Sequence, residues 1–531
     1  MRALWILVGV LLTGPILTSP QAAAAHPAAG DSITIGSTLY TLNLSTFWGA
    51  VGQFGANPST PALRADTNAT PLQVFRFADG MDSTNLSANE TWTPGASSAT
   101  AGTIGINVLT DWQFCEELRS PCTFVFQLPG ETDSAGDVRS ALQFLQIHDI
   151  EPAYYSIGNE PSLWKHWGEA WSTWATSDSS KPTGLQYAQE VQQLVPVIRA
   201  IVPGARIIGL EDDQCSNDSY VQQVAKINGP NLSAIACHSY SANSQDVAGA
   251  GLQQFYNVLT STGANPATNV PKVRAGIRFG CGSCSLPVWI DEDNAISGAD
   301  PAHFSRYTSS YPDFVLTAGD LLDAIAVGTP HVLFFQYWAP SGSTYGMVNG
   351  SGLYLRPTYF WYSAFADLIP SGPVSVNQTS VAPSTQPLVA QFLQSNSTNS
   401  VVVVNGNATT PEIVTLPVSM EGASGGRSVY WDNNTLQPSV MSWTAAPPSL
   451  VYMLGPQSVL LVDSSRAPAI AGTGGSGASP APPSGTGTNS SGGFLLQPDG
   501  SSAIPWTWIG AGAGLLGVVA LAAVSRHRRL R

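Results

Sequence analysis

The chain has 531 residues, of which only 11% are charged, and its formal net charge at pH 7 is −14. A chain of this length can form two or more domains around a large core. The excess of acidic residues argues against nucleic acid as a partner, because little basic surface is available to neutralise phosphates.

The N-terminus has the pattern of a secretory signal peptide. Arg2 precedes an apolar run from Leu4 to Leu17, and small residues follow up to Ala25. This order predicts cleavage near Ala25, and the apolar run is too short for an uncleaved membrane anchor. We therefore expect residues 1–25 to be a signal peptide and the mature protein to be exported.

Residues 31–368 alternate strand-like apolar runs with stretches of helical spacing. Eight such runs can be counted: Leu39–Leu44, Leu72–Phe77, Thr123–Leu128, Pro152–Ile157, Arg206–Leu210, Ala234–His238, Pro287–Ile290 and Val332–Trp338. Eight strand–helix units are the signature of a (β/α)8 barrel. A doubly wound sheet, the alternative, would not naturally give eight units.

Polar residues follow nearly every one of these runs. They are Arg76, Asp79, Gln127, Asn159, Glu160, Glu211, Asp212, His238, Tyr240 and Glu292. In a (β/α)8 barrel the C-terminal ends of all strands lie on one face, and that face carries the chemistry. We therefore expect these side chains to surround one mouth.

Residues 370–465 change to short β-rich runs that turn residues separate. The runs are Leu388–Phe392, Val401–Val404, Glu412–Leu416, Ser428–Tyr430, Ser449–Met453 and Ser458–Val462. Because no helical stretch intervenes, this region is predicted to be an all-β sandwich domain. Ser32–Ile35 is a candidate for one further strand of it.

The C-terminal region predicts a membrane anchor. Residues 466–505 are rich in Gly, Ser and Pro, as in a flexible linker. Residues 506–525 are apolar over about the span of a bilayer core, and the basic tail 526–531 follows at once. Because positive charge stays on the cytoplasmic side, the folded domains are expected outside, at the cell surface.

Six cysteines in an exported protein predict disulfides. We expect local pairing among the 15 possible connectivities. The pairs would be Cys115 with Cys122, Cys281 with Cys284, and the remaining Cys215 with Cys237. Several Asn-X-Ser/Thr sequons also fit an exported glycoprotein surface: Asn43, Asn85, Asn231, Asn377 and Asn407.

Two glutamates at strand ends form a candidate catalytic pair. Glu160 lies in Gly-Asn-Glu-Pro after the fourth run, and Glu292 follows the seventh. Two carboxyl groups can cleave a glycosidic bond, one as acid/base and one as nucleophile, and in retaining enzymes they stand about 5–5.5 Å apart. A barrel can bring strands four and seven across one mouth.

The neighbours of the two glutamates assign their roles. Asn159 could donate to a sugar 2-hydroxyl, which makes Glu160 the acid/base and Glu292 the nucleophile. Strand alternation places Asp291 and Asp293 on the face opposite Glu292. The alternative is that Glu160 is only a structural carboxylate at a strand end.

These motifs resemble clan A of the glycoside hydrolases and, within it, family 79, the heparanase and β-glucuronidase family. His238-Ser239-Tyr240 resembles the family's His-x-Tyr on strand six. The loop ending at Gly298 resembles the one whose backbone meets a uronate carboxylate, and Tyr345 falls where the family places a carboxylate-binding tyrosine. The resemblance covers about residues 31–465 and implies these substrate contacts: Asn159, Asp82, Arg76, Gln127, His238, Tyr240, Gly298 and Tyr345.

The chain departs from family 79 in the loop after Arg76, where Asp82 is one position out of register. The expected function is retaining hydrolysis of a β-linked uronic acid in a carbohydrate substrate. The alternatives are another clan A activity (arabinofuranosidase, xylosidase or glucanase) and a catalytically silent glycan-binding surface protein. We expect a monomer with no cofactor and no metal, because His166 and Glu169 lack metal-ligand spacing.

Overall fold

The computed structural model describes residues 31–465 apart from 53–60, 78–103, 129–134, 164–181, 214, 217, 244–251, 258, 260–264, 298–309, 340–345, 350–353, 383–386, 418–419, 421–424, 433–437 and 445–450. The predicted signal peptide, linker, membrane helix and basic tail lie outside the described residues. Within the described part of the chain, no helix is long and apolar enough to cross a membrane.

Eight parallel strands close into a barrel, which confirms the predicted fold. They are β2 (Trp48–Gly52), β3 (Val74–Phe77), β4 (Thr123–Leu128), β5 (Tyr154–Ile157), β6 (Ile207–Asp212), β7 (Ala234–Asn243), β8 (Val288–Ser297) and β9 (Val332–Ala339). Closure occurs because β9 pairs with both β2 and β8. Two short strands, β10 (Val348–Asn349) and β11 (Tyr354–Leu355), continue the sheet beyond β9.

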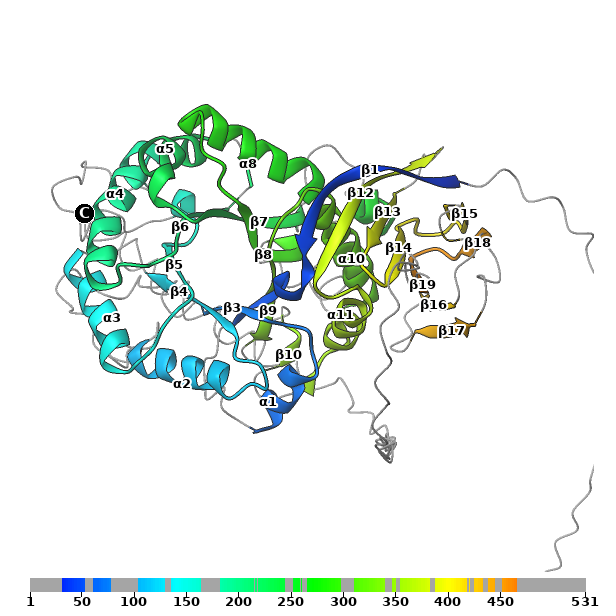
Figure 1. Ribbon diagram of the computed structural model, residues 1–531, viewed down its shortest axis with the longest axis horizontal. Coiled ribbons are helices and arrows are strands. Elements are labelled where there is room, and N and C mark those ends of the chain that lie inside the picture. Colours follow the sequence, from blue (N-terminus) through cyan, green and yellow to red (C-terminus); the bar gives the residue numbers. More distant parts are fainter. Residues whose placement is uncertain are drawn as a thin grey trace, which may run out of the picture. The chain divides into compact units, whose positions relative to one another are not determined.

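Helices surround the ring of strands (Figure 1). Their bounds are α1 (Pro61–Asn68), α2 (Ile104–Glu116), α3 (Ala135–Ile147), α4 (Gly184–Ile201), α5 (Ser219–Asn228), α7 (Leu252–Asn257), α8 (Pro266–Cys281), α10 (Tyr311–Ala326) and α11 (Pro357–Leu368). Helix α4 illustrates how the sequence sets the start of a helix and its buried face. Thr183 and Gln186 form a capping box at its start, and Tyr187, Val191 and Leu194 bury one face.

The prediction of the first barrel strand was wrong. Leu39–Leu44 belongs mainly to β1 (Asp31–Asn43), which pairs antiparallel with β12 (Pro373–Ala382) of the second domain. The first barrel strand is instead β2, whose two glycines hide it from a search for apolar runs. The strand needs one of them, because a Cβ at Gly49 would lie 2.6 Å from the carbonyl oxygen of Val74.

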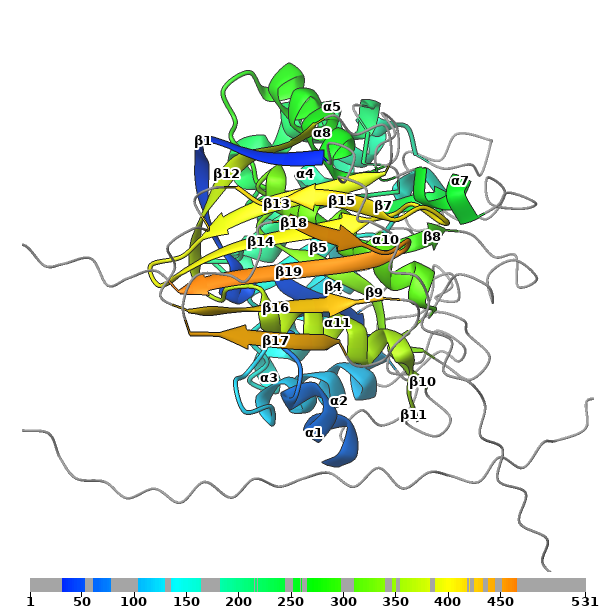
Figure 2. The same ribbon diagram turned by 90° about the vertical axis from the view of Figure 1, so that its right-hand side faces the viewer.

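The second domain is a nine-stranded β domain that includes β1, so the predicted extra strand at Ser32–Ile35 is confirmed. Its other strands are β12, β13 (Leu388–Gln394), β14 (Thr398–Asn405), β15 (Glu412–Thr415), β16 (Gly426–Trp431), β17 (Ser439–Trp443), β18 (Val451–Leu454) and β19 (Ser458–Ser465) (Figure 2). The search for apolar runs missed β12 and β17. The strand order is β17-β16-β19-β14-β13-β12-β1-β15-β18.

Period-two alternation in β14 gives this sheet two apolar faces. Val401 and Val403 pack with residues of β15 and β18 in the core of the β domain. Val402 and Val404 point the other way into the core that the barrel helices share. Trp431 of β16 contacts α10 and α11 there, with its ring centroid 5.8 Å from that of Phe314. The β domain therefore packs against the barrel through an apolar face.

The three expected disulfides are present: Cys115–Cys122, Cys215–Cys237 and Cys281–Cys284. The Cys215–Cys237 bond ties the chain just after β6 to β7, directly before His238.

Removing the Cys215–Cys237 disulfide should destabilise the protein more than removing Cys281–Cys284. The sequence separations are 22 and 3 residues, so loop-closure entropy gives about 3 kcal/mol for the first bond and about half of that for the second. Urea unfolding of the two double Cys→Ala variants measures this difference. Equal losses in the free energy of unfolding would contradict it.

Candidate active site

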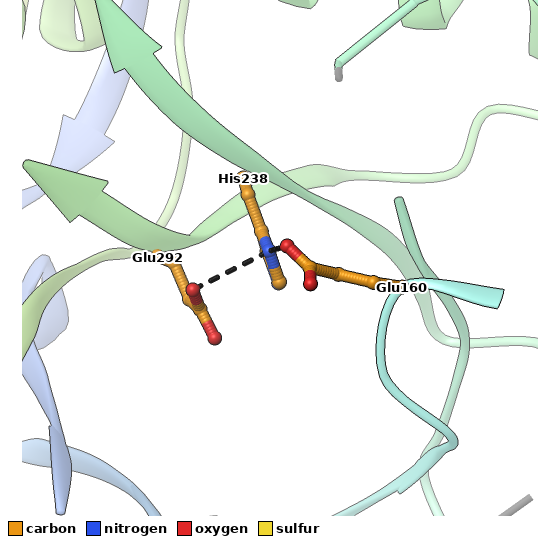
Figure 3. A group of neighbouring side chains, drawn as sticks. All are labelled: Glu160, His238 and Glu292. Carbon is orange, nitrogen blue, oxygen red and sulfur yellow. Dashed lines mark hydrogen bonds and ion pairs between the residues drawn. The ribbon is translucent and has the colours of Figure 1, made fainter. Parts of the chain in front are cut away.

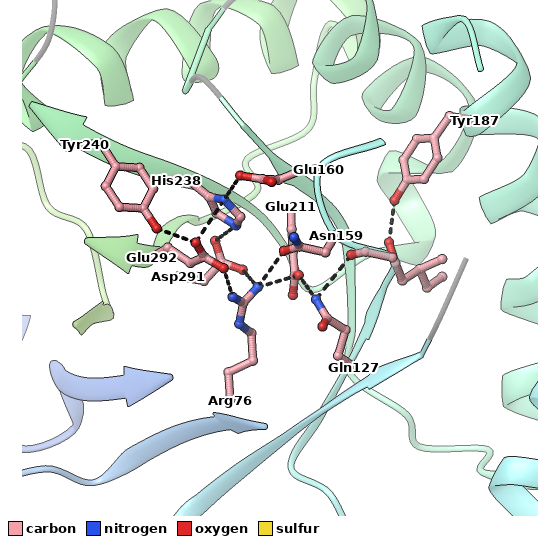
Figure 4. Close-up of polar contacts among 12 residues, drawn as sticks. Arg76, Gln127, Asn159, Glu160, Tyr187, Glu211, His238, Tyr240, Asp291 and Glu292 are labelled. Atoms are coloured by element: carbon pink, nitrogen blue, oxygen red, sulfur yellow. Dashed lines mark hydrogen bonds and ion pairs between the residues drawn. The ribbon is translucent and has the colours of Figure 1, made fainter. Parts of the chain in front are cut away.

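The C-terminal ends of strands β3 to β8 bring a polar cluster into one mouth of the barrel (Figure 4). The predicted site residues that meet there are Arg76, Gln127, Asn159, Glu160, His238, Tyr240 and Glu292. Asp82, Gly298 and Tyr345 lie outside the described residues. The structure therefore defines the positions of the candidate catalytic pair and its neighbours.

Glu160 is presented by a turn in left-handed backbone conformation. Gly158 has φ 68° and Glu160 has φ 46°. Such a φ costs a residue with a side chain about 1–2 kcal/mol, and costs of this kind cluster at functional sites. Two backbone hydrogen bonds hold the turn: Gly158 N–H donates to Leu128 at 2.7 Å, and Glu160 N–H donates to Glu211 at 3.0 Å. The Glu160 side chain remains 26% exposed and so faces the open mouth.

A β-bulge in β8 changes which residues face the site. Between β7 and β8, Cys237 pairs with Ile290 but His238 pairs with Glu292, so β8 contains one extra residue. As a result Asp291 and Glu292 both contact Arg76. The expectation that alternation turns Asp291 away from Glu292 was therefore wrong.

Asp293 keeps its expected orientation away from the mouth. Its pKa is raised well above the ordinary value by burial and by the nearby carboxylates of Asp320 and Asp313 on α10. The bulge thus leaves Glu292 lining the site, whereas the adjacent Asp293 faces α10.

His238 lies between the two catalytic candidates (Figure 3). Its Nδ1 is 2.7 Å from Oε1 of Glu160 and 3.4 Å from Oε2 of Glu292. The nitrogen and one oxygen of each carboxyl group lie within 4.8 Å of one another. These oxygens are therefore closer together than the about 6.5–9.5 Å that separates the carboxyl groups of inverting glycosidases.

The charges around Glu292 favour its ionised form. Burial alone would raise the pKa of Glu292, but His238 and Arg76 outweigh it and lower that pKa. The Tyr240 hydroxyl adds to this effect by donating to Oε2 at 2.5 Å. Burial alone would lower the pKa of His238, but Glu292 and its neighbouring carboxylates raise it to about 10. The site therefore holds an imidazolium beside a carboxylate nucleophile candidate.

Arg76 is fully buried and joins four polar groups. Its Nη1 donates to Glu211 at 2.5 Å, to Asp291 at 3.2 Å and to the amide oxygen of Asn159 at 3.2 Å. Its Nη2 donates to Glu292. Arg76 therefore fixes the orientation of the Asn159 side chain through its amide oxygen.

Two further acids contact Arg76: Glu211, which was expected at the mouth without a role, and Asp291, which was expected to face away. Glu211 Oε2 accepts from both Arg76 and Gln127, and its side chain is fully buried. The position of Glu211 at the end of a strand-like run was a usable signal. Asp291 offered none, because the bulge that turns it inward has no mark in the sequence.

Two groups in the site have the donor types of a metal centre: Glu160–His238–Glu292 and Glu211–His238–Asp291. The raised pKa of His238 keeps a proton on its ring at neutral pH. Arg76 also bridges Glu211 and Asp291. A metal would have to displace these cations, so the donor set fits a hydrogen-bonded charge network better than a metal site.

No protein-family model matches the chain, and no curated protein sequence matches it. Solved structures are similar over 82% of it. They include a family 51 α-L-arabinofuranosidase from Bifidobacterium longum (12% identity, TM-score 0.61, 99% of that chain). They also include the α-L-arabinofuranosidase from Thermotoga maritima (11% identity, TM-score 0.59, 100% of that chain) and a family 44 xyloglucanase from Paenibacillus polymyxa (10% identity, TM-score 0.56, 99% of that chain). The protein therefore has the (β/α)8 fold of clan A glycoside hydrolases with an attached β domain.

Proposed function

We propose that the protein is a retaining glycoside hydrolase in which Glu292 is the nucleophile and Glu160 the acid/base. The observation that carries the proposal is the contact of His238 Nδ1 with both carboxyl groups, whose oxygens lie within 4.8 Å. Glu160 follows β5 and Glu292 lies within β8, and both line the mouth where this fold carries its chemistry.

In the first step, the Glu292 carboxylate attacks the anomeric carbon and the glycosidic C–O bond breaks. Glu160 transfers its proton to the leaving oxygen, and an ester then joins Glu292 to the sugar. The lowered pKa of Glu292 supports this role, because the attacking group must be ionised.

In the second step, Glu160 takes a proton from water while the water oxygen attacks the anomeric carbon. The ester bond breaks, which restores the Glu292 carboxylate and the protonated Glu160. Two displacements at one carbon retain its configuration. The contact between Nδ1 of His238 and Oε1 of Glu160, at 2.7 Å, orients this carboxyl group for both steps.

We propose a neutral glycoside as the substrate, with an α-L-arabinofuranoside as the first candidate and a β-xyloside or glucan next. The basic side chains recorded in the described part of the mouth are already engaged by acids: Arg76 by three carboxylates and His238 by Glu160 and Glu292. A uronate substrate would place a further negative charge next to these acids. The arabinofuranosidases among the similar structures also support this choice.

A β-linked uronide remains the second candidate, which the resemblance to family 79 favours. Its recognition would depend on Gly298 and Tyr345. A silent glycan-binding protein is disfavoured, because binding alone does not require an ionised Glu292 facing an acid partner. The disulfides fit an extracellular protein, and we propose that the site acts outside the cell.

A panel of aryl glycosides tests the substrate proposal. Aryl α-L-arabinofuranoside or β-xyloside should be hydrolysed at least about 100-fold faster, in kcat/KM, than aryl β-glucuronide, because the latter places a carboxylate near paired acids. Faster cleavage of the glucuronide would overturn the neutral-sugar proposal and leave the mechanism standing. Cleavage of none of them by a folded protein would favour the silent alternative.

A further inference from the structure

We propose that Glu211 is a positioning residue: its carboxyl group and backbone hold Arg76, Gln127 and the Glu160 turn in one arrangement. The inference rests on the function proposed above. The Glu211 side chain has no exposed surface, whereas the Glu292 side chain keeps 4%, so we expect no direct contact of Glu211 with the sugar. It acts through the residues that it holds.

Three hydrogen bonds converge on Glu211. Its Oε2 accepts from Nη1 of Arg76 at 2.5 Å and from Nε2 of Gln127. Its backbone carbonyl accepts from the N–H of Glu160 at 3.0 Å and so closes the turn that presents the acid/base. One residue therefore contacts the backbone of one catalytic candidate and the guanidinium that holds the other.

A second β-bulge brings Glu211 to this place. Between β6 and β7, Ile208 pairs with Ala234 but Glu211 pairs with Ala236, so β6 contains one extra residue. Bulges next to active sites re-aim side chains. The bulges in β6 and β8 turn Glu211 and Asp291 towards Arg76, and both carboxyl groups reach its Nη1.

The position of Arg76 makes this contact matter for the reaction. The same guanidinium donates to Glu292 and to the amide oxygen of Asn159. Loss of the Glu211 acceptor would let the guanidinium shift towards Asp291 and would turn both groups with it. A misplacement of about 1 Å in a catalytic site can cost about 10²-fold in rate.

The charges around Glu211 oppose one another. Burial raises the pKa of Glu211 to about 8, against the pull of the Arg76 guanidinium, and the nearby Asp291 raises it further. The buried group therefore depends on the hydrogen bonds from Arg76 and Gln127, which a side chain of the same length can keep.

The test compares Glu211→Gln with Glu211→Asp. Glutamine keeps the length and the acceptor oxygen, so kcat should stay within about tenfold of wild type. Aspartate keeps the acid but is one methylene shorter, so kcat should fall by about 10²-fold. KM should change little in either variant, because Glu211 does not contact the substrate. Thermal unfolding and circular dichroism measure the fold of each variant.

Asp323→Asn is the matched control outside the site. Asp323 is a buried acid of α10, and burial with the nearby Asp320 raises its pKa well above the ordinary value, but its carboxyl group does not contact Arg76. The kcat of this variant should match that of wild type. A general effect of neutralising a buried acid would lower the kcat of the Asp323→Asn and Glu211→Gln variants equally and would overturn the inference.

The remaining outcomes are also decisive. A folded Glu211→Gln variant that loses more than about 10²-fold in kcat overturns the positioning role, and so does one that is less active than Glu211→Asp. In both cases the activity of the wild type leaves the proposed function standing. Should Glu211→Asp not fold, the Glu211→Gln result decides alone. A wild type that cleaves no glycoside overturns the proposed function and this inference together.

Discussion

Glu292→Gln is expected to lower kcat by about 10⁴-fold or more while the protein stays folded, because the amide cannot attack the anomeric carbon. Steady-state kinetics on the best aryl glycoside of the panel measure this loss. Asp293→Asn is the matched control: it neutralises the adjacent acid, which faces α10, and should keep kcat close to wild type. Comparable activity of Glu292→Gln and wild type would remove Glu292 from the mechanism.

The acid/base role proposed for Glu160 predicts a different kinetic pattern. Glu160→Ala should lose less activity on aryl glycosides with good leaving groups than on natural linkages, because a good leaving group needs no proton. Added azide should restore turnover and give a glycosyl azide of retained configuration. In Glu292→Ala the same anion should replace the nucleophile and give the inverted product. The opposite stereochemical pairing would exchange the two roles.

The stability of the protein is expected to fall as the pH rises from about 5 to about 8. Burial raises the pKa of Asp320 to about 7 and that of Glu211 to about 8, and it raises those of Asp293 and Asp323 well above the ordinary value. These acids hold protons more tightly in the folded than in the unfolded chain. Their stabilisation is therefore full below about pH 4 and is lost as the pH passes their folded pKa.

The size of the pH effect follows from linkage. Each pKa unit corresponds to about 1.4 kcal/mol, so several such groups together should cost several kcal/mol of unfolding free energy. Glu292 acts in the opposite sense: its lowered pKa adds stability above about pH 4, which is lost as the pH falls through its folded pKa. Urea unfolding at about pH 5 and at about pH 8 measures the difference in the free energy of unfolding.

Asp293→Asn should reduce the pH dependence, because it removes one buried acid of similar shape. Glu151→Gln, at an exposed position, is the control and should leave the difference between the two pH values unchanged. Wild-type stability that is constant or rises between about pH 5 and about pH 8 would contradict the account of these buried acids.

The barrel was predictable because its strands are apolar on both faces and alternate with amphipathic helices. Seven of the eight expected runs overlap barrel strands. The first was misplaced, since Trp48–Gly52 contains two glycines that read as a turn, while Leu39–Leu44 has the apolar pattern of β1 in the other domain. Long-range pairing decides between such segments, and a local pattern does not contain it.

The catalytic candidates were predictable for a local reason. Gly158 and Asn159 precede Glu160 in a strand-end turn, and a positive φ there favours glycine. The roles of Glu211 and Asp291 depend on two bulges, each of which adds one residue to a strand and breaks period two. The proposed preference for a neutral sugar depends on the pairing of Arg76 and His238 with acids, and a local sequence pattern does not contain these pairings.

Covalent trapping tests the central claim most directly. The protein is treated with a 2-deoxy-2-fluoro glycoside of the best substrate, which slows the second displacement, and its peptides are then analysed by mass spectrometry. The account predicts one sugar attached to Glu292 and no label in Glu292→Gln. A sugar on Asp291, or no adduct with a substrate that wild type cleaves, would contradict it.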